Sequence, residues 1–346
     1  MDVAEPVFAT VARYLMRTAV GSDAKEQLED VRRLLPGLRP AAMCALMTEL
    51  GVHLLLPQAY QQFHTDGVLC LLPETIQQQL AAARTGAYIN AGVRARALSR
   101  VVMEFRKCGI DPVLMKGMAL ANTVYPIFGA RQMVDVDLWV TSGDLSEPDR
   151  ILADLGYLLK DDLADGHVFD GPGNVRLDVH RRLRIFDQFE PAILVTKVSP
   201  PHLSLDEVSV FSPPVTLSHV AYHMAAHWPK TGLQARWVLD YAMLIAYHKR
   251  DLKPEEVLRF TPAESRGWVS GLARFVAEEL GLDPHPGLLD IDADGPKITL
   301  QEIARSRRRA LWGIPKWRGW LRLGAAVTGV RPRPTWPRPR LADFVP

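Results

Sequence analysis

Two aspartates separated by a single residue lie within a short apolar run. Asp135 and Asp137 alternate with valine and leucine between residues 134 and 140. Successive side chains of a β-strand point to opposite faces of a sheet, so both carboxylates of such a strand would share one face. Charged groups on an interior-looking strand are costly without a cation or hydrogen-bond donors. The run therefore predicts a strand that directs two acids at a common partner.

Basic residues precede this run. Lys116 and Gly117 follow a short apolar segment, and Arg131 lies shortly before Asp135. Carboxylate oxygens suit hard divalent cations, and Lys and Arg side chains bind phosphate oxygens. The segment therefore predicts a metal site beside a phosphate-binding site. Ion pairs of the two acids with Arg131 or Arg176 are the alternative interpretation.

The composition is that of a soluble globular protein. The chain has 346 residues, of which 48% are hydrophobic, enough for a sizeable core and two or three domains. A formal net charge of +2 argues against a general binder of polyanions. Three scattered cysteines without a Cys-x-x-Cys motif predict reduced, cytoplasmic residence. Neither a signal peptide nor a membrane-spanning segment is recognisable.

The hydrophobic pattern predicts helices first and a sheet afterwards. Apolar residues at helical spacing, interrupted by Pro and Gly, predict short helices over residues 6–80 and a longer helix from about 74 to 107. A strand at 113–115, a helix-sized insert at 118–125, the acidic strand and a helix at 144–155 then follow. This is a βαβα order.

A third acid lies on a later strand. Arg176, Asp178 and His180 alternate with apolar residues, so they would share one face of a strand at 175–180. Without the first two acids, a plain salt-bridged edge strand would explain this pattern equally well. Asp-Gly and Gly-Pro-Gly turns join this strand to two others. Those two strands are predicted at residues 157–160 and 167–169.

The rest of the chain is predicted to be helical and ends in a basic tail. Helical patterns cover residues 217–228, 233–247 and 254–280. Residues 303–342 contain no Asp or Glu but many Arg, and the last part repeats Arg-Pro, which favours extended backbone. Packing of the tryptophans in this stretch is the default interpretation, while an anionic partner for the tail stays open.

In their order along the chain, these motifs resemble the DNA polymerase β-like nucleotidyltransferase superfamily, and more closely its bacterial family of uncharacterised nucleotidyltransferases. The resemblance covers roughly residues 87–244, and the combination is far more specific than a lone Asp-x-Asp pair. The matching residues are 113–117, Leu120, Tyr125, Pro126, Arg131, 135–140, 155–157, 177–180, Leu217, His219, His223, His227, Trp237 and Asp240.

The resemblance implies an α+β fold with a small mixed sheet as the nucleotidyltransferase core. Helical N-terminal and C-terminal regions would flank this core. The expected boundaries are a helical region at 1–85, the catalytic domain at 86–200, a helical domain at 201–330 and the basic Pro-rich tail at 331–346.

It also implies an enzyme that moves a nucleoside monophosphate from an NTP such as ATP to a hydroxyl or phosphate, releasing pyrophosphate. The acceptor would be a small molecule, a sugar or a protein. Asp135, Asp137 and Asp178 would be catalytic and hold two Mg²⁺ ions, with Mn²⁺ as an alternative. Two cations roughly 3.5–4 Å apart neutralise the leaving group and acidify the attacking oxygen. Asp178 would assist deprotonation of the acceptor.

Lys116, Gly117 and Arg131 are implied to bind the phosphates of the nucleotide. The wider superfamily carries Gly-Ser or Gly-Gly after the first strand, whereas this chain has Lys116-Gly117-Met118, as the narrower family does. The departure supports a second hypothesis, a nucleotide-binding or regulatory module without turnover. An RNA-directed transferase is a third hypothesis that depends on the basic tail, and nucleic acid is not the favoured partner.

Histidines of the later helices are further candidates. His180, His223 and His227 could line the wall of the cleft. His219, His223 and His227 recur every fourth residue and would share one helix face, a spacing that could ligate zinc. The helix lacks the Glu of the zinc-protease motif, so contact with the catalytic sheet is the favoured interpretation.

Overall fold

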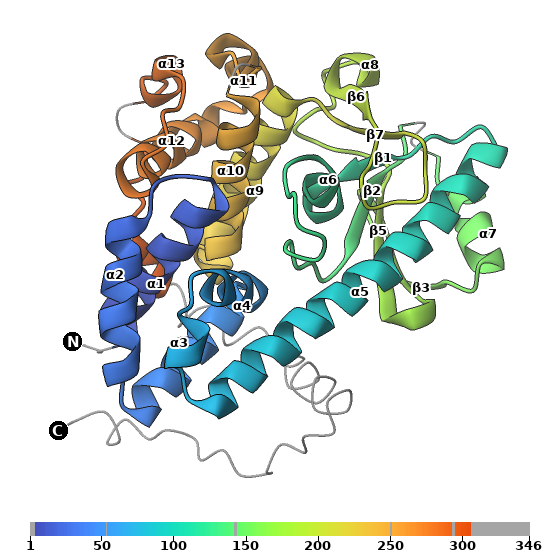
Figure 1. Ribbon diagram of the computed structural model, residues 1–346. Coiled ribbons are helices and arrows are strands. Elements are labelled where there is room, and N and C mark those ends of the chain that lie inside the picture. The colour runs from blue at the N-terminus through green and yellow to red at the C-terminus, as the bar shows by residue number, and fades with distance from the viewer. Residues whose placement is uncertain (1–3, 53, 142–143, 250, 293–294, 306–346) are drawn as a thin grey trace.

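The computed structural model describes residues 4–52, 54–141, 144–249, 251–292 and 295–305. The predicted tail at 331–346 lies outside the described residues. Within them, a seven-stranded mixed sheet lies beside two helical regions (Figure 1), which confirms the predicted α+β class.

The N-terminal region consists of short helices followed by one long helix, as the hydrophobic spacing predicts. The long helix α5 spans Glu74–Lys107, and it begins directly after Pro73. It ends before Gly109, which has a φ of +75°, a left-handed backbone conformation that favours glycine. The short helices are α1 (Ala4–Ala19), α2 (Lys25–Leu34), α3 (Pro40–Val52) and α4 (Leu56–Thr65).

The sheet has the strand order β3-β4-β5-β2-β1-β7-β6. Strand β2 pairs antiparallel with β1 and parallel with β5, and β1 also pairs parallel with β7. The strands are β1 (Val113–Met115), β2 (Val136–Trp139), β3 (Leu158–Leu163), β4 (Gly166–Gly171), β5 (Val175–His180), β6 (Val195–Val198) and β7 (Val208–Phe211). The helices between them are α6 (Lys116–Thr123), α7 (Ser146–Asp154) and α8 (Pro191–Leu194).

Strands β6 and β7 were not predicted from the sequence. All four residues of β7 are buried, so the strand lacks the alternation that marks a half-exposed strand. A short apolar run of this kind cannot be told from a buried helical segment by its period. The predicted domain boundaries stay predictions, and the one after residue 200 is better placed after Phe211, because β7 pairs with β1 inside the sheet.

The two faces of the sheet have different coverings. Val136 and Leu138 of β2 and Leu177 of β5 face the helices α5 and α7, where they join one buried apolar cluster. Figure 1 shows α5 crossing this side of the sheet. Trp139 and Met115 belong to a cluster on the other face, together with Val215 from the next helix, α9 (Pro213–Thr231). Alternation along β2 therefore places Asp137 on the face covered by α9.

The C-terminal helices share their core with the N-terminal ones. Phe8 and Tyr14 of α1 lie in the same buried cluster as Tyr241 and Phe275, and Figure 1 shows α1 close to α12. The two helical regions that flank the sheet in sequence thus pack into one body. These helices are α9 (Pro213–Thr231), α10 (Ala235–His248), α11 (Pro254–Phe260), α12 (Arg266–Leu280), α13 (Pro286–Leu289) and α14 (Leu300–Arg305).

In the described part of the chain, no single helix is long and apolar enough to cross a membrane. One bent pair, Pro40–Gly51 with Leu56–Thr65, meets that test only when joined across a turn of 116°, which is weak evidence for a span.

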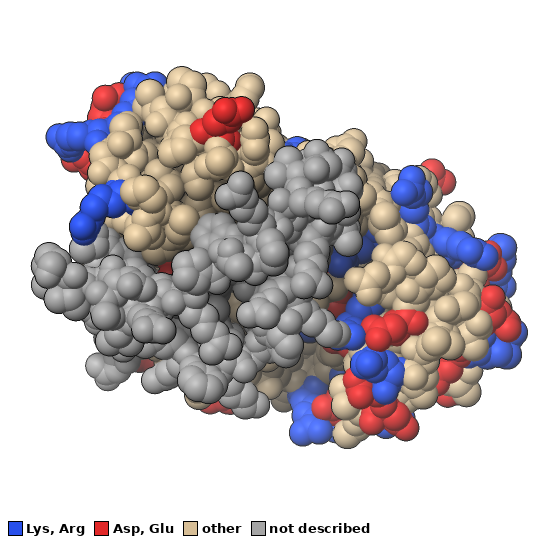
Figure 2. Space-filling model, turned by 90° about the horizontal axis from the view of Figure 1, so that it is seen from below, with Lys and Arg blue, Asp and Glu red and all other residues tan. Residues whose placement is uncertain are grey.

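Charges of both signs are mixed on the described surface. Figure 2 shows Lys and Arg next to Asp and Glu over the part of the molecule that carries the sheet. Arg150 pairs with Glu147 and Asp154 on α7, and Arg176 pairs with Asp170 across β5 and β4. Exposed pairs of this kind contribute little to stability.

A buried ion pair connects the sheet to the C-terminal helices. Arg131, in the segment before β2, donates from Nε and Nη2 to the two carboxylate oxygens of Asp240 on α10, each at 2.7 Å. The hydroxyl of Tyr125 donates to the same carboxylate at 2.7 Å. The side chains of Arg131 and Asp240 are only 7% and 3% exposed. Burial disfavours the Arg131 charge, but Asp240 outweighs it and raises the pKa of the guanidinium.

Replacing Asp240 by Asn should destabilise the fold strongly. The variant leaves the buried Arg131 guanidinium without its counter-charge, and breaking a buried pair in this way costs about 3–5 kcal/mol. Urea unfolding followed by circular dichroism measures the change. Asp154→Asn removes an exposed partner from Arg150 by the same substitution and should leave the midpoint almost unchanged. Equal midpoints for the two variants would contradict the structural role of the pair.

Candidate active site

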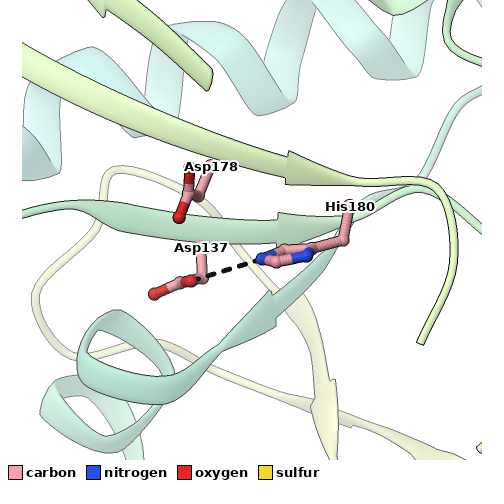
Figure 3. Close-up of side chains that lie close together, drawn as sticks. All are labelled: Asp137, Asp178 and His180. Carbon is pink, nitrogen blue, oxygen red and sulfur yellow. Dashed lines mark hydrogen bonds and ion pairs between the residues drawn. The ribbon is translucent and has the colours of Figure 1, made fainter. Parts of the chain in front are cut away.

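The parallel pairing of β2 with β5 brings two of the predicted acids together. Asp137 and Asp178 are register partners, and their side chains point to the same face of the sheet (Figure 3). His180, two residues further along β5, places Nε2 3.4 Å from Oδ1 of Asp137. One ligand atom from each of the three residues lies within 4.8 Å of the others.

The third predicted acid lies just before β2. Asp135 is partly buried, and its carboxylate interacts electrostatically with Asp137, Lys116 and Arg236. It also contributes to the negative potential at Asp178. Asp135 therefore interacts electrostatically with the other two acids, although it is not a member of the group of three ligand residues.

Lys116 is held against the acids by an unusual backbone conformation. It follows the last residue of β1 and has a φ of +47°, which is costly for a residue with a side chain. Its ammonium donates to Oδ1 of Asp137. The side chain of Asp137 is 4% exposed, whereas that of Lys116 is 28% exposed and is therefore partly in contact with solvent.

Gly117 lies beneath Arg131. A Cβ atom at this position would lie 3.2 Å from Cβ of Met133 and 3.7 Å from the guanidinium carbon of Arg131. The first contact is tighter than ordinary packing, so a larger residue would press on the segment that carries Arg131. The absence of a side chain thus permits close packing of α6 against this segment.

The three acids differ in their affinity for protons. Burial opposes ionisation of Asp137, but Lys116 and His180 outweigh it and hold the pKa of Asp137 well below its ordinary value. Burial and the negative charge of Asp137 raise the pKa of Asp135. Burial, Asp137 and Asp135 likewise raise the pKa of Asp178. The negative charge of Asp137 is thus balanced by Lys116, whereas Asp135 and Asp178 are repelled by the charge of Asp137.

This arrangement fits a divalent cation. Carboxylate oxygens from two strands converge, and a cation between them would relieve the repulsion that raises the pKa values of Asp135 and Asp178. Oxygen ligands suit Mg²⁺, and an imidazole such as that of His180 is also accepted by transition metals such as Mn²⁺ or Zn²⁺.

Arg131 is not presented to this cluster as a free cation. Two of its nitrogens bind Asp240, and Nη1 donates to the backbone carbonyl of Gln132. To bind a phosphate, the guanidinium would have to leave a buried carboxylate, which is costly. The structure favours a role for Arg131 in positioning the loop before β2.

Helix α9 forms the wall opposite the acids. His219 packs against Phe186 and Phe211, and burial together with the nearby Lys116 lowers its pKa to about 3. Burial and Lys116 also keep the pKa of His223 well below its ordinary value. The rings of His223 and His227 lie 4.3 Å apart. Among the described residues, the histidines of α9 do not form a three-ligand metal group.

A cavity of about 300 Å³ opens from the β5 side of the acids. Asp178 and His180 line one side of it, and His219 and Tyr222 of α9 line the other. The β3–β4 turn and the segment after β5 complete its rim, with Ala164, Asp165, Arg182 and Arg184.

Two features of this site were not found from the sequence. Arg236 precedes Trp237 on α10 and lies near Asp135, but a single Arg at a helix start carries no distinctive signal. The contact of Lys116 with Asp137 depends on the pairing of β1 with β2, which sets Met115 opposite Asp137. A prediction that β1 and β2 pair antiparallel would have brought Lys116 close to Asp137.

Solved structures with a similar chain path cover about half of this chain. The solution structure of the antibiotic-resistance factor ANT(2'')-Ia has a TM-score of 0.38 and 15% identity, and the match covers 47% of this chain and 86% of the other. Its crystal structure in complex with adenylyl-2''-tobramycin has a TM-score of 0.37 and 16% identity, and the match covers 47% of this chain and 92% of the other. The crystal structure of an antigenic nucleotidyltransferase-like protein from Paracoccidioides brasiliensis has a TM-score of 0.37 and 14% identity, and the match covers 54% of this chain and 92% of the other.

No curated protein matches the sequence at a significant level. A family model described as "Uncharacterised nucleotidyltransferase" matches residues 43–270, more than half of the chain. The resemblance inferred from the ordered motifs is thereby confirmed. The chain belongs to this family of uncharacterised nucleotidyltransferases, enzymes that transfer phosphorus-containing groups.

Proposed function

We propose that this enzyme transfers a nucleoside monophosphate from an NTP to a hydroxyl or phosphate acceptor in a Mg²⁺-dependent reaction. The observation that carries the proposal is the in-register pairing of Asp137 with Asp178, beside His180, on the face of the sheet covered by α9. Mn²⁺ is a plausible substitute, because His180 adds a nitrogen ligand to the carboxylates.

In this reaction an acceptor oxygen forms a bond to the α-phosphorus, and the bond between that phosphorus and the bridging oxygen breaks. Pyrophosphate leaves with the bond electrons, and the acceptor hydroxyl gives up its proton. Asp178 is the group proposed to take that proton, because it is the one of the three acids that lines the cavity beside the cluster. Asp135, Asp137 and Asp178 would hold the divalent cations, which supply charge neutralisation at the phosphates.

The cavity beside Asp178 is the proposed entrance of the acceptor. Its lining includes the acid assigned as the base and does not include Lys116. A volume of about 300 Å³ is at the lower end of the range for small-molecule sites. Its lining includes the charged side chains of Asp165, Arg182 and Arg184, which fit a hydroxylated or phosphorylated small molecule better than a purely apolar one.

A binding module without turnover is the second candidate. The ion pair of Lys116 with Asp137 supports it, since an ammonium held at a carboxylate can replace a bound metal ion. The RNA-directed alternative depends on the basic tail, which lies outside the described residues. Pyrophosphate release in the presence of Mg²⁺ separates a transferase from a module that only binds.

Removing one of the paired carboxylates should abolish metal-dependent turnover. Loss of outer partners of metal ligands costs about 10–100-fold, so Asp137→Asn and Asp178→Asn should each lower Mg²⁺-dependent pyrophosphate release by at least about 100-fold. The assay presents each of the four NTPs with Mg²⁺ or Mn²⁺ and a panel of acceptors. Asp161→Asn, on the exposed edge strand β3, is the matched control. Unchanged release in the paired-acid variants would rule out this mechanism.

Filling the cavity should impair use of the acceptor without affecting the nucleotide. Ala164 is exposed at the rim, so Ala164→Trp adds bulk there without disturbing the core. Pyrophosphate release stimulated by sugars, polyols or sugar phosphates should fall at least about 10-fold, because blocking a productive position costs more than about 1.4 kcal/mol. Ala164→Ser is the control, and calorimetry with Mg·NTP checks that nucleotide affinity is retained. Equal stimulation in both variants would place the acceptor elsewhere.

A further inference from the structure

Arg236 lies near the acid cluster, and its guanidinium has a hydrogen-bond donor without a partner among the described residues. It lies in the first turn of α10 and is partly buried. Within the described part of the chain, its Nε has no hydrogen-bond partner. Its guanidinium carbon lies 5.9 Å from the centre of the Trp237 ring. A cation–π contact holds the group through its face and leaves the N–H donors at its edge available.

The charges around Arg236 favour an anion. Burial lowers its pKa to about 10, and the second cause is the neighbouring cation Arg131. The acid that acts most strongly on the charge of Arg236 is Asp240, whose oxygens already accept hydrogen bonds from Arg131 and Tyr125. Asp135 interacts with Arg236 only electrostatically, and its own pKa remains raised. Both arginines thus interact with the charge of Asp240, and the hydrogen bonds to its carboxylate come from Arg131 and Tyr125.

A purely structural role explains this arrangement poorly. A buried donor without a partner costs free energy, so an arginine that served only packing would be replaced at little loss by an uncharged residue. Unsatisfied polar groups that persist in a fold are typical of sites where a ligand completes the bonding. Arg236 also lies near Asp135, whereas the cavity opens beside Asp178 and His180.

We propose that Arg236 binds the triphosphate of the nucleotide, in the place expected for Arg131. This inference rests on the proposed transferase function. It assigns one end of the acid cluster to the nucleotide and the other end to the acceptor. The polyphosphate lies toward Lys116 and Arg236, and the acceptor lies toward Asp178. Arg131 acts indirectly: it occupies Asp240 and so leaves Arg236 for the phosphates. The planar guanidinium can donate two parallel hydrogen bonds to one phosphate group.

Inorganic triphosphate with Mg²⁺ is the probe, because it carries the phosphates without base or sugar. Calorimetry on the full chain compares the native protein with Arg236→Gln and Arg236→Lys. Loss of a charged hydrogen-bonding partner should weaken binding of Mg·triphosphate by about 10–100-fold in Arg236→Gln. Arg236→Lys should recover only part of the loss, because an ammonium lacks the planar fork. In turnover, the same variants should raise KM for the NTP by a similar factor.

Thermal unfolding gives a second readout. Arg236→Gln should leave Tm unchanged or raise it, since the variant removes a buried charge without a full set of partners. Arg259→Gln is the matched control, because Arg259 also lies over an aromatic ring, 5.5 Å from the centre of Phe260, on α11. This control should change neither triphosphate affinity nor KM.

The outcomes separate the two proposals. Triphosphate binding by Arg236→Gln that equals the native affinity would overturn the role of Arg236 and leave the transferase proposal intact. A marked fall in Tm in both Arg236 variants, with full binding capacity in the folded fraction, would show a structural role instead. If the native protein neither binds Mg·triphosphate nor releases pyrophosphate from any NTP, both proposals fail together.

Discussion

The parallel pairing of β2 with β5 is the constraint on which the rest of the site depends. The two strands lie in register from Val136 to Trp139, so Asp137 faces Asp178 across one inter-strand spacing of about 4.8 Å. A shift of one residue would turn one acid into the apolar layer beneath α5. Buried Val136, Leu138 and Leu177 oppose that shift, because they fill this layer. The apolar face thus fixes the position of the polar one.

Two ion pairs divide the cations around the acids into different roles. Arg131 and Asp240 are buried on both sides, and their contact fastens α10 to the segment that leads into β2. Lys116 and Asp137 meet at the edge of the site, where the Lys116 side chain keeps contact with solvent. A buried, bidentate pair is costly to open, whereas a pair whose lysine side chain is partly exposed can rearrange more readily when another cation or an anion arrives. Proximity to a reaction centre therefore does not identify the cation that binds substrate.

The sequence was most informative where the pattern was long or alternated regularly. Helix α5 has the predicted limits, since its apolar spacing continues over many turns. Strand β5 was predicted at its observed bounds, because Arg176, Asp178 and His180 alternate with buried residues. Strand β7 was missed, because four consecutive buried residues carry no period. The shared core of the N-terminal and C-terminal helices was missed as well, because contacts between distant segments leave no local pattern.

The sequence by itself determined most of the local elements, the three candidate acids and the family, because alternation, helical spacing and motif order are properties of neighbouring residues. Only the tertiary structure decided which partner each charged group has. Arg131, which is predicted from the sequence to bind a phosphate, contacts Asp240, more than a hundred positions away along the chain. Arg236 carries no local signal, yet it interacts electrostatically with Asp135. Electrostatic interactions depend on distance in space and on burial, and both arise only when the sheet and the helices pack together.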